Sequence, residues 1–205
     1  MHTPYRNAAL DHLYNGLFCD DVQMLLPAGR ADGPAWARTL RADPADMPAL
    51  RALAEHPRTE TRVAALALRR LQQAGQPVAG RQLLGVVVEV PLDSGLDTLA
   101  AYRDGSVRFL RGSGRSTLVE APVDAFEPIV RRLLAASQSV VDLIGPSDRP
   151  RGPAPQQHVR LNFIVSDGLY FGEGPMQALM ADPMAAPVLR TAVELLNELN
   201  ALATA

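Results

Sequence analysis

Four polar residues in the segment 160–175 could together form a small acidic site. Arg160 and Asn162 alternate with apolar residues in a pattern typical of a β-strand, and Asp167 begins a two-residue turn signal. Glu173 follows on the returning segment, between two glycines. Two carboxylates in different environments can perform acid–base chemistry, and the arginine and asparagine can bind an anion. If the glycines bend the returning strand, we expect all four side chains to converge around a cleft.

The same residues also have a structural interpretation, which is the simpler one. Asp167-Gly168 suits a hairpin turn, because glycine readily adopts the positive φ that such a turn needs. The stretch from Gly172 to Pro175 suits a bulge that leads into a helix. Both interpretations stay open at this point, as does the question of whether the protein is an enzyme.

The composition excludes several other kinds of site. Cys19 is the only cysteine, which rules out an intrachain disulfide, a CxxC pair and a cysteine-based zinc site. Its neighbours Asp20 and Asp21 disfavour a thiolate, so we expect one of them to cap the segment from Val22 to Leu26 instead. The four histidines lack zinc-site spacing, and all 20 basic residues are arginine, which excludes P-loop and Schiff-base chemistry. We therefore expect no cofactor and no metal.

Charge and hydropathy limit the partners that the chain is expected to have. The formal net charge is -2 and the two signs are interspersed, which gives no electrostatic reason to bind nucleic acid or an anionic membrane. Residues 1–17 lack the apolar run of a signal peptide, and no window of about 18 residues is apolar enough to span a bilayer. We expect a cytoplasmic protein whose possible partner is another protein or a second copy of itself.

Residues 1–76 are expected to form a helical N-terminal region, in which prolines and glycines separate segments with helical spacing of apolar residues. The expected elements are a helix from Pro4 to Leu17, a loop from Pro27 to Pro34, a helix from Ala35 to Arg41, and a helical hairpin with arms marked by Met47–Leu53 and Val63–Leu71. Thr59 is expected to cap the second arm, and Arg69-Arg70 to lie on its solvated face.

Residues 77–205 show the pattern of an α+β domain, in which β-branched runs and glycine turns precede a long amphipathic segment. The expected elements are a meander of four strands (Leu83–Val90, Leu96–Tyr102, Val107–Leu110 and Ser116–Glu120), a helix from Ala125 to Ile144, a proline-rich connector from Pro146 to Pro155, a hairpin around Asp167-Gly168, and helices that begin at Pro175 and Pro187. Asp104-Gly105, between the second and third strands, is a two-residue hairpin signal, for a turn that needs positive φ at both positions. Asp124 and Glu127 are expected to form a capping pair for the long helix.

These elements predict an α+β fold in which the helical N-terminal part packs on an antiparallel sheet of about six strands. The final hairpin is expected to join the meander in one sheet, because an isolated hairpin is only marginally stable. Helices grouped after the strands imply that they cover one face of the sheet. We expect the opposite face to stay partly open.

The chain resembles a family of uncharacterised bacterial proteins in three segments. These are LFCDD (Leu17–Asp21), GLDTLAAY followed by DGSVR (Gly95–Tyr102 and Asp104–Arg108), and SDGLYFGEGP (Ser166–Pro175). The resemblance covers most of the chain and implies a bacterial, cytoplasmic protein. It implies no activity, cofactor or partner, so it assigns no catalytic role to any residue.

Two hypotheses for the function follow from these observations. The first is a non-enzymatic interaction or regulatory module that binds another protein, or a second copy, through the open face or an edge of the sheet. The second is a small-ligand-binding protein or an enzyme that uses Arg160, Asn162, Asp167 and Glu173 in a cleft beside the helix at Pro175.

Overall fold

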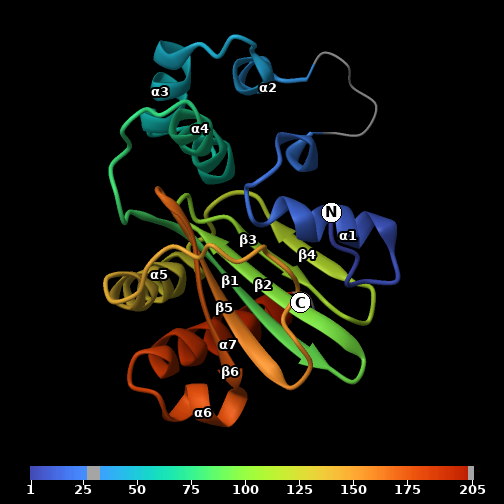
Figure 1. Ribbon diagram of the computed structural model, residues 1–205. Helices are drawn as coiled ribbons and strands as arrows, with labels where there is room; N and C mark the ends of the chain where they lie inside the picture. The colour runs from blue at the N-terminus through green and yellow to red at the C-terminus, as the bar shows by residue number, and fades with distance from the viewer. Residues whose placement is uncertain (27–32, 203–205) are drawn as a thin grey trace.

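The computed structural model describes residues 1–26 and 33–202 as helices around one antiparallel sheet (Figure 1). The helices before the sheet are α1 (Ala8–Gly16), the short 3-10 helix η1 (Val22–Leu25), α2 (Ala35–Arg41), α3 (Met47–Glu55) and α4 (Thr61–Gln73). The later helices are α5 (Glu127–Val141), α6 (Met176–Ala181) and α7 (Ala185–Leu202). The predicted order of helices and strands is confirmed.

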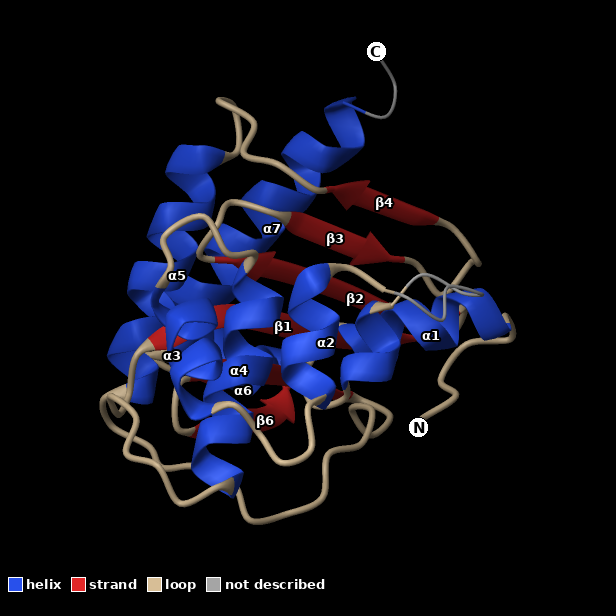
Figure 2. Cartoon of the chain, turned by 90° about the horizontal axis from the view of Figure 1, so that it is seen from above, coloured by secondary structure: helices blue, strands red, loops and turns tan. Residues whose placement is uncertain are grey.

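Six strands form a single sheet in the order β4-β3-β2-β1-β5-β6, and all neighbours are antiparallel (Figure 2). The strands are β1 (Leu83–Leu92), β2 (Gly95–Tyr102), β3 (Val107–Leu110), β4 (Ser116–Val119), β5 (His158–Val165) and β6 (Gly168–Pro175). The predicted meander forms β1 to β4, and the predicted hairpin joins it because β5 pairs with β1. β4 and β6 are therefore the edge strands.

One face of the sheet packs against α5 and α7. Val86 and Phe163 of the central strands point to this side and meet Leu133 of α5 and Leu195 of α7 in one buried cluster. Both helices carry apolar residues at helical spacing, so that each presents a continuous stripe to the sheet. The long amphipathic helix that the sequence predicted thus has the predicted role, over a somewhat shorter span.

The other face of the sheet is also covered, by the N-terminal helices. Val87 and Ile164 point to this side and share a second buried cluster with Tyr14 of α1 and Leu66 of α4. The α+β class and the packing of the N-terminal part on the sheet are confirmed, but the expected open face is absent where these helices lie. The physical reason is visible in β1, whose first seven residues are all buried because strands covered on both faces need apolar residues at consecutive positions.

The turn between β2 and β3 connects the sheet to the N-terminal region. Gly105 has the positive φ, 83°, that the predicted turn requires, but Asp104 does not, and the loop has three residues, Arg103–Gly105, between the bonded pair Tyr102 and Ser106. Asp104 accepts a hydrogen bond at 2.7 Å from the backbone N–H of Thr61, and the Thr61 hydroxyl accepts one at 3.0 Å from the backbone N–H of Asp104. Asp104 therefore satisfies an N–H group in the first turn of α4, and this explains why the predicted cap Thr59 is not used.

Several helix boundaries differ from the sequence prediction. α5 begins without a side-chain cap, so the predicted pairing of Asp124 with Glu127 is wrong. The last helix begins at Ala185 rather than at Pro187, because the Asp182 side chain accepts hydrogen bonds from the backbone N–H groups of Met184 and Ala185. The loop predicted from Pro27 to Pro34 lies largely outside the described residues.

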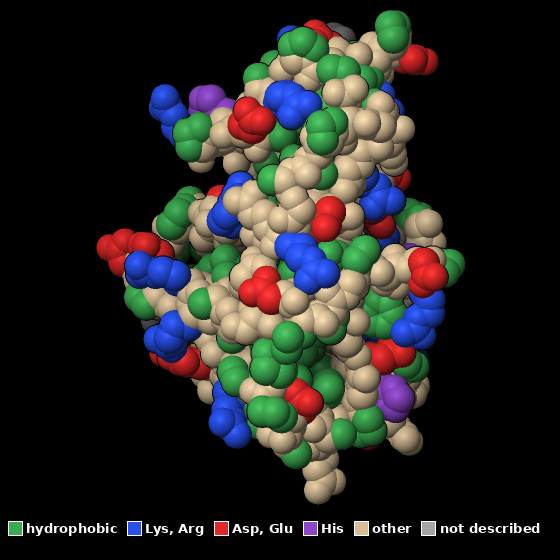
Figure 3. Space-filling model, turned by 60° about the vertical axis from the view of Figure 1, so that its left-hand side comes forward, with side chains coloured by type: hydrophobic (Ala, Val, Ile, Leu, Met, Phe, Trp, Pro, Cys, Tyr) green, Lys and Arg blue, Asp and Glu red, His purple; other side chains and the backbone are tan. Residues whose placement is uncertain are grey.

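The surface mixes both signs of charge on the side that Figure 3 presents, where arginines and carboxylates alternate with apolar side chains. Among the described helices, none combines the length and the hydropathy that a membrane crossing requires.

Candidate functional site

Arg160 and Glu173 face each other across β5 and β6 as direct partners in the strand register. Arg160 Nε donates to Glu173 Oε2 at 2.9 Å, and Arg160 Nη1 donates to the carbonyl of Gly152 in the proline-rich connector. The two side chains are 12% and 23% exposed. Because the pair neutralises itself and holds the connector on the sheet, it leaves little charge for a ligand.

Asn162 belongs to a buried hydrogen-bond network between the sheet and α1. Its Nδ2 donates to Glu89 Oε2 at 2.8 Å and to the carbonyl of Val87 at 3.2 Å, while the Tyr14 hydroxyl donates to Glu89 Oε1 at 2.7 Å. Glu89 is fully buried, and this burial raises the pKa of its carboxyl group even though both hydrogen bonds oppose the shift. This hydrogen-bond network connects α1 to β1 and β5.

Asp167 lies at the opposite end of the β5–β6 hairpin from Glu173. The register runs without a bulge from Val165 opposite Gly168 to His158 opposite Pro175, so the predicted bend is absent. The turn and Glu173 are separated by five register steps, or about 17 Å along the strand. The expectation that Asp167 and Glu173 converge is therefore wrong, although Arg160, Asn162 and Glu173 do share the face that carries α1.

A different group of charged residues meets in a cleft of about 460 Å³ between α4, the connector and the β5–β6 turn. Arg69 comes from α4, Arg149 and Arg151 come from the connector, Asp20 follows α1, and Asp167 lies in the turn. We call this cavity the arginine cleft. The charged side chains of its lining are these three arginines and two aspartates, which leave one formal positive charge.

Arg151 is held rigidly in the wall of the arginine cleft. Its Nε donates to Asp20 Oδ2 at 2.7 Å, and its Nη2 donates to Asn15 Oδ1 at 3.2 Å. The guanidinium group also lies 4.2 Å from the centre of the Phe18 ring, a distance at which cation–π attraction is effective. Its Nη1 is buried and has no hydrogen-bond partner among the described residues. The side chain is therefore positioned by its neighbours with one donor left unused.

Arg69 and Arg149 add positive charge that no carboxylate within residues 1–26 and 33–202 neutralises by an ion pair. Both side chains are exposed. The Arg149 guanidinium lies 4.8 Å from the centre of the Phe171 ring, which gives it a preferred place without using its N–H donors. These two side chains are thus available to an anion that enters from solvent.

Asp167 and Cys19 also line the arginine cleft. The Tyr170 hydroxyl donates to Asp167 Oδ2 at 3.1 Å, whereas Asp167 Oδ1 is buried and lacks a partner in the described structure. Cys19 is buried, and its burial raises the pKa of the thiol. A thiol that stays protonated is a poor nucleophile, so the lining is better suited to binding than to covalent catalysis.

Asp21 takes the role that the sequence predicted for one of the two aspartates. Its side chain accepts a hydrogen bond at 2.8 Å from the backbone N–H of Gln23 and thereby caps η1. Asp20 is left free to pair with Arg151. The two adjacent carboxylates therefore have separate functions, one in local structure and one in the cleft.

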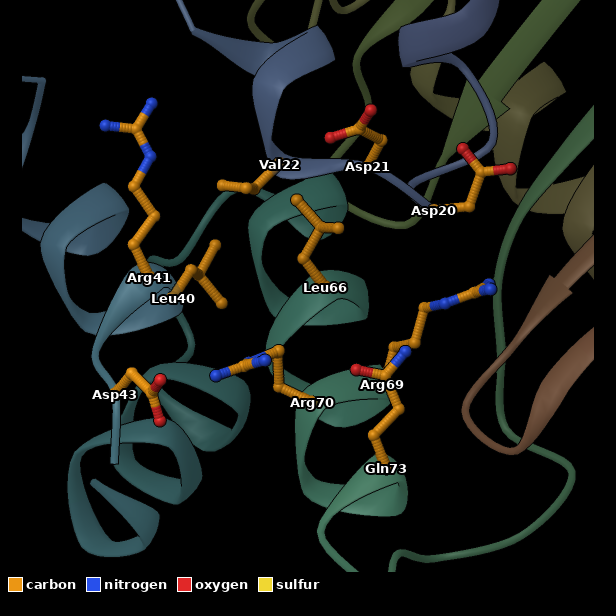
Figure 4. Close-up of a pocket in the computed structure, with 10 residues that line it drawn as sticks. All are labelled: Asp20, Asp21, Val22, Leu40, Arg41, Asp43, Leu66, Arg69, Arg70 and Gln73. Carbon is orange, nitrogen blue, oxygen red and sulfur yellow. The ribbon is translucent and has the colours of Figure 1, made fainter. Parts of the chain in front are cut away.

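Two further cavities adjoin the arginine cleft, since both share Arg69 and Asp20 with it. The larger, of about 460 Å³, lies between η1, α2 and α4 (Figure 4). There the side chain of Arg69 extends to the side of Asp20, and that of Arg70 extends to the side of Asp43 (Figure 4). Arg70 Nη2 donates to the carbonyl of Ala42 at 3.1 Å. The prediction of a solvated face is therefore wrong for Arg70.

The titratable residues do not form a metal site in the part of the chain that the structure describes. No group of three or more histidine, cysteine, aspartate or glutamate side chains lies close enough together to hold an ion. The carboxylates of the arginine cleft instead contact Arg151 and Tyr170.

Local sequence patterns do not reveal the arginine cleft, because its residues come from four separate segments of the chain. One signal was present in the sequence: Arg149 and Arg151 lie two positions apart within a proline-rich connector, where an ordinary linker needs no charge. Their convergence with Arg69 depends on the packing of α4 against the sheet, which local patterns do not encode.

Comparison of the chain with known proteins adds no relative to this description. No protein-family model matches the sequence, and no curated protein matches it either.

Proposed function

We propose that this protein binds a small anionic molecule in the arginine cleft. The observation that carries the proposal is the meeting of Arg69, Arg149 and Arg151 in one cavity, to whose lining the described residues contribute only two carboxylates. The cavity volume of about 460 Å³ lies within the range of roughly 300–1,000 Å³ that is usual for small-ligand sites.

The chemistry of the three arginines favours a carboxylate or a phosphate group. A guanidinium group offers its N–H donors in a planar fork that matches two oxygens of such an anion. Arg151 is already held by Asp20 and Asn15 and stacked near Phe18, so its ordering costs little entropy when the ligand binds. Arg69 and Arg149 would then close on the anion from the exposed side.

This proposal corresponds to the small-ligand alternative of the sequence analysis, with a different set of residues. Of the four residues named there, only Asp167 lines the cleft. The competing hypothesis of a protein-interaction module relied on an open sheet face, and the N-terminal helices cover that face, so this hypothesis now concerns the sheet edges. A bacterial origin and a cytoplasmic location remain proposals, with which a single buried cysteine is compatible.

Thermal unfolding of the protein with a panel of anions tests the proposal. The panel contains inorganic phosphate, pyrophosphate, succinate, citrate and glutamate, each at matched ionic strength against sodium chloride. A ligand present at 100 times its dissociation constant stabilises the folded state by about 2.7 kcal/mol, which corresponds to several degrees in melting temperature for a chain of this size. We expect at least one organic or phosphate anion to produce such a shift.

Matched arginine variants separate the arginine cleft from general anion effects. We expect Arg69→Gln and Arg149→Gln to abolish the shift, while Arg131→Gln on α5 preserves it because that side chain is 72% exposed and lies outside the cleft. An equal loss in all three variants, or a protein that no anion stabilises beyond the chloride control, would count against the proposal.

A further inference from the structure

The two edges of the sheet differ in how they are protected. At the β6 edge, the backbone N–H of Ser147 in the connector donates to the carbonyl of Leu169 at 2.8 Å, so the connector occupies part of that edge. At the β4 edge, the only element of the described chain that pairs with β4 is β3 (Figure 2). An unpaired edge strand presents a row of free backbone donors and acceptors to any chain that can add to the sheet.

The hydrogen-bond pattern of the β3–β4 hairpin shows which backbone groups of β4 face outward. The backbone N–H of Arg111 donates to the carbonyl of Arg115 at 2.8 Å. Bonded positions alternate along an antiparallel ladder, so Thr117 and Val119 also bond to β3. The N–H and C=O groups of Ser116 and Leu118 therefore point away from the sheet.

Strand β4 lacks the features that usually prevent edge-to-edge pairing. Its sequence Ser-Thr-Leu-Val contains no charged residue and no proline, and its register with β3 has no bulge. Leu118, whose backbone N–H and C=O groups point away from β3, has a side chain that is 41% exposed. The strand is thus a short, regular edge with an apolar side chain at its centre.

We propose that β4 pairs with β4 of a second copy of this chain, antiparallel and about a two-fold axis at Leu118. A two-fold axis perpendicular to a continuous sheet places residues of the same face opposite each other, which sets Leu118 against its own copy and Ser116 against Glu120. Arg115 lies just beyond one end of β4, and Glu120, which pairs with Arg108 of the same chain, lies just beyond the other, so an antiparallel pair keeps the like charges of the two copies apart. A parallel arrangement would bring like charges together at both ends.

The end of α7 adds apolar surface next to the same edge. Asn200 accepts a hydrogen bond from Arg111 at the β3–β4 turn, so the last turn of α7 lies beside this hairpin. Leu202 in that turn is 55% exposed. A four-residue strand with these neighbours buries less area than the roughly 1,200 Å² of a standard stable interface, and the dimer is therefore expected to depend on concentration.

Disulfide trapping of the full chain tests the proposed register. In the two-fold arrangement the Cα atoms of the two Leu118 residues lie about 5.5 Å apart, which suits a disulfide bond. We expect Leu118→Cys to form a covalent dimer rapidly under mild oxidation. The matched control is Leu143→Cys, at a leucine that is 71% exposed at the end of α5, and it should cross-link slowly; the native Cys19 is only 3% exposed and should not react.

Sedimentation velocity over a range of concentrations tests whether the unmodified protein uses the same surface. We expect a monomer–dimer equilibrium for the native chain that Leu118→Lys shifts to monomer, because it places two positive charges together on the axis, and that Leu143→Lys leaves unchanged. A native chain that stays monomeric at every concentration overturns the proposal. So does a dimer that persists in Leu118→Lys, or equal cross-linking of the two cysteine variants.

Discussion

The carboxyl group of Glu89 is the most completely buried acid in the described structure, and its surroundings determine how it titrates. It lies between β1 and α1, where the Tyr14 hydroxyl and the Asn162 amide donate to its two oxygens. Burial disfavours the charged carboxylate more than these donors favour it, so the pKa of Glu89 is raised. In the unfolded chain the same group returns to its ordinary pKa, and folding therefore depends on pH at this residue.

The sign of this dependence follows from the raised pKa of Glu89. Between the ordinary pKa and the raised one, the folded state binds more protons than the unfolded state, so the free energy of unfolding falls as pH rises through that window. We expect Glu89→Gln, which is neutral at every pH, to lose this part of the pH dependence and to gain stability relative to the native chain as pH rises. Urea unfolding from about pH 4 to pH 8 measures the effect.

The control for Glu89 is an exposed glutamate on the surface of the protein. Glu127→Gln on α5 removes the charge of a side chain that is 59% exposed and pairs, among the described residues, only with the exposed Arg131 at 3.8 Å, and it should leave the pH profile close to that of the native chain. Parallel profiles for Glu89→Gln and the native protein would show that burial does not raise the pKa of this carboxyl group.

At the residue scale, the sequence predicted that Arg160, Asn162 and Glu173 lie close together, but it did not predict the residues with which they form hydrogen bonds. Strand alternation alone places Arg160 and Asn162 on one face, and the hairpin turn places Glu173 opposite Arg160. Their partners Tyr14, Glu89 and the connector carbonyl come from distant parts of the chain. Because Arg160, Asn162 and Glu173 form their hydrogen bonds within the protein, these three residues have a structural role. The same dependence on distant segments concealed the arginine cleft.

At the element scale, the contact between β1 and β2 depends on a glycine. Gly85 lies opposite Tyr102 in the register, and a Cβ atom built at Gly85 would stand 2.6 Å from Tyr102 Cδ1. The Tyr102 ring has no freedom to move aside, because it is fully buried and its hydroxyl donates to the carbonyl of Leu17 at 2.8 Å. The absence of a side chain at Gly85 thus leaves the space that the Tyr102 ring occupies.

We expect Gly85→Ala to destabilise the fold by about 1–3 kcal/mol, the usual cost of overpacking a buried site. Gly172→Ala on β6 is the matched control, because no heavy atom lies within 4 Å of the Cβ position there. That substitution should be neutral or slightly stabilising, since alanine has less conformational freedom than glycine in the unfolded chain. The midpoints of urea unfolding compare the two, and equal midpoints would contradict the steric argument.

Elements whose signals are local were predictable, and those that depend on tertiary contacts were not. The helix from Ala35 to Arg41 and the positions of two hairpins were predicted from a few neighbouring residues. The predicted two-residue turns are wrong in detail, because three residues, Arg103–Gly105, close the first hairpin, and Ser166-Asp167 close the second, where Gly168 already pairs with Val165. The start of α4 could not be predicted in this way, because the backbone N–H of Thr61 donates to Asp104, 43 residues further along the chain. The same holds for the β6 edge, which a bond from Ser147 to Leu169 protects.

At the scale of the whole molecule, the sheet lies between two helical layers of different origin. Residues 1–76 supply the layer with α1 and α4, and α5 and α7 supply the other. The sequence predicted that a helical N-terminal region packs on the sheet of an α+β domain, but it also predicted a partly open sheet face, which this region covers. The arginine cleft lies where these two regions meet, so its geometry depends on their docking.

Unfolding experiments test whether the two regions behave as one cooperative unit. Trp36 is the only tryptophan and lies in α2, at the margin of the buried cluster that joins the N-terminal helices to the sheet, so its fluorescence reports on the first region alone. Strand residues such as Val87 and Ile164 would be exposed to water if that region detached, and this cost favours simultaneous unfolding. We expect the fluorescence and far-ultraviolet circular dichroism transitions to coincide in urea, and Gly85→Ala to shift both equally. A fluorescence transition that precedes the circular dichroism transition would show that the N-terminal helices can leave the sheet by themselves, and the arginine cleft would then open before the protein unfolds.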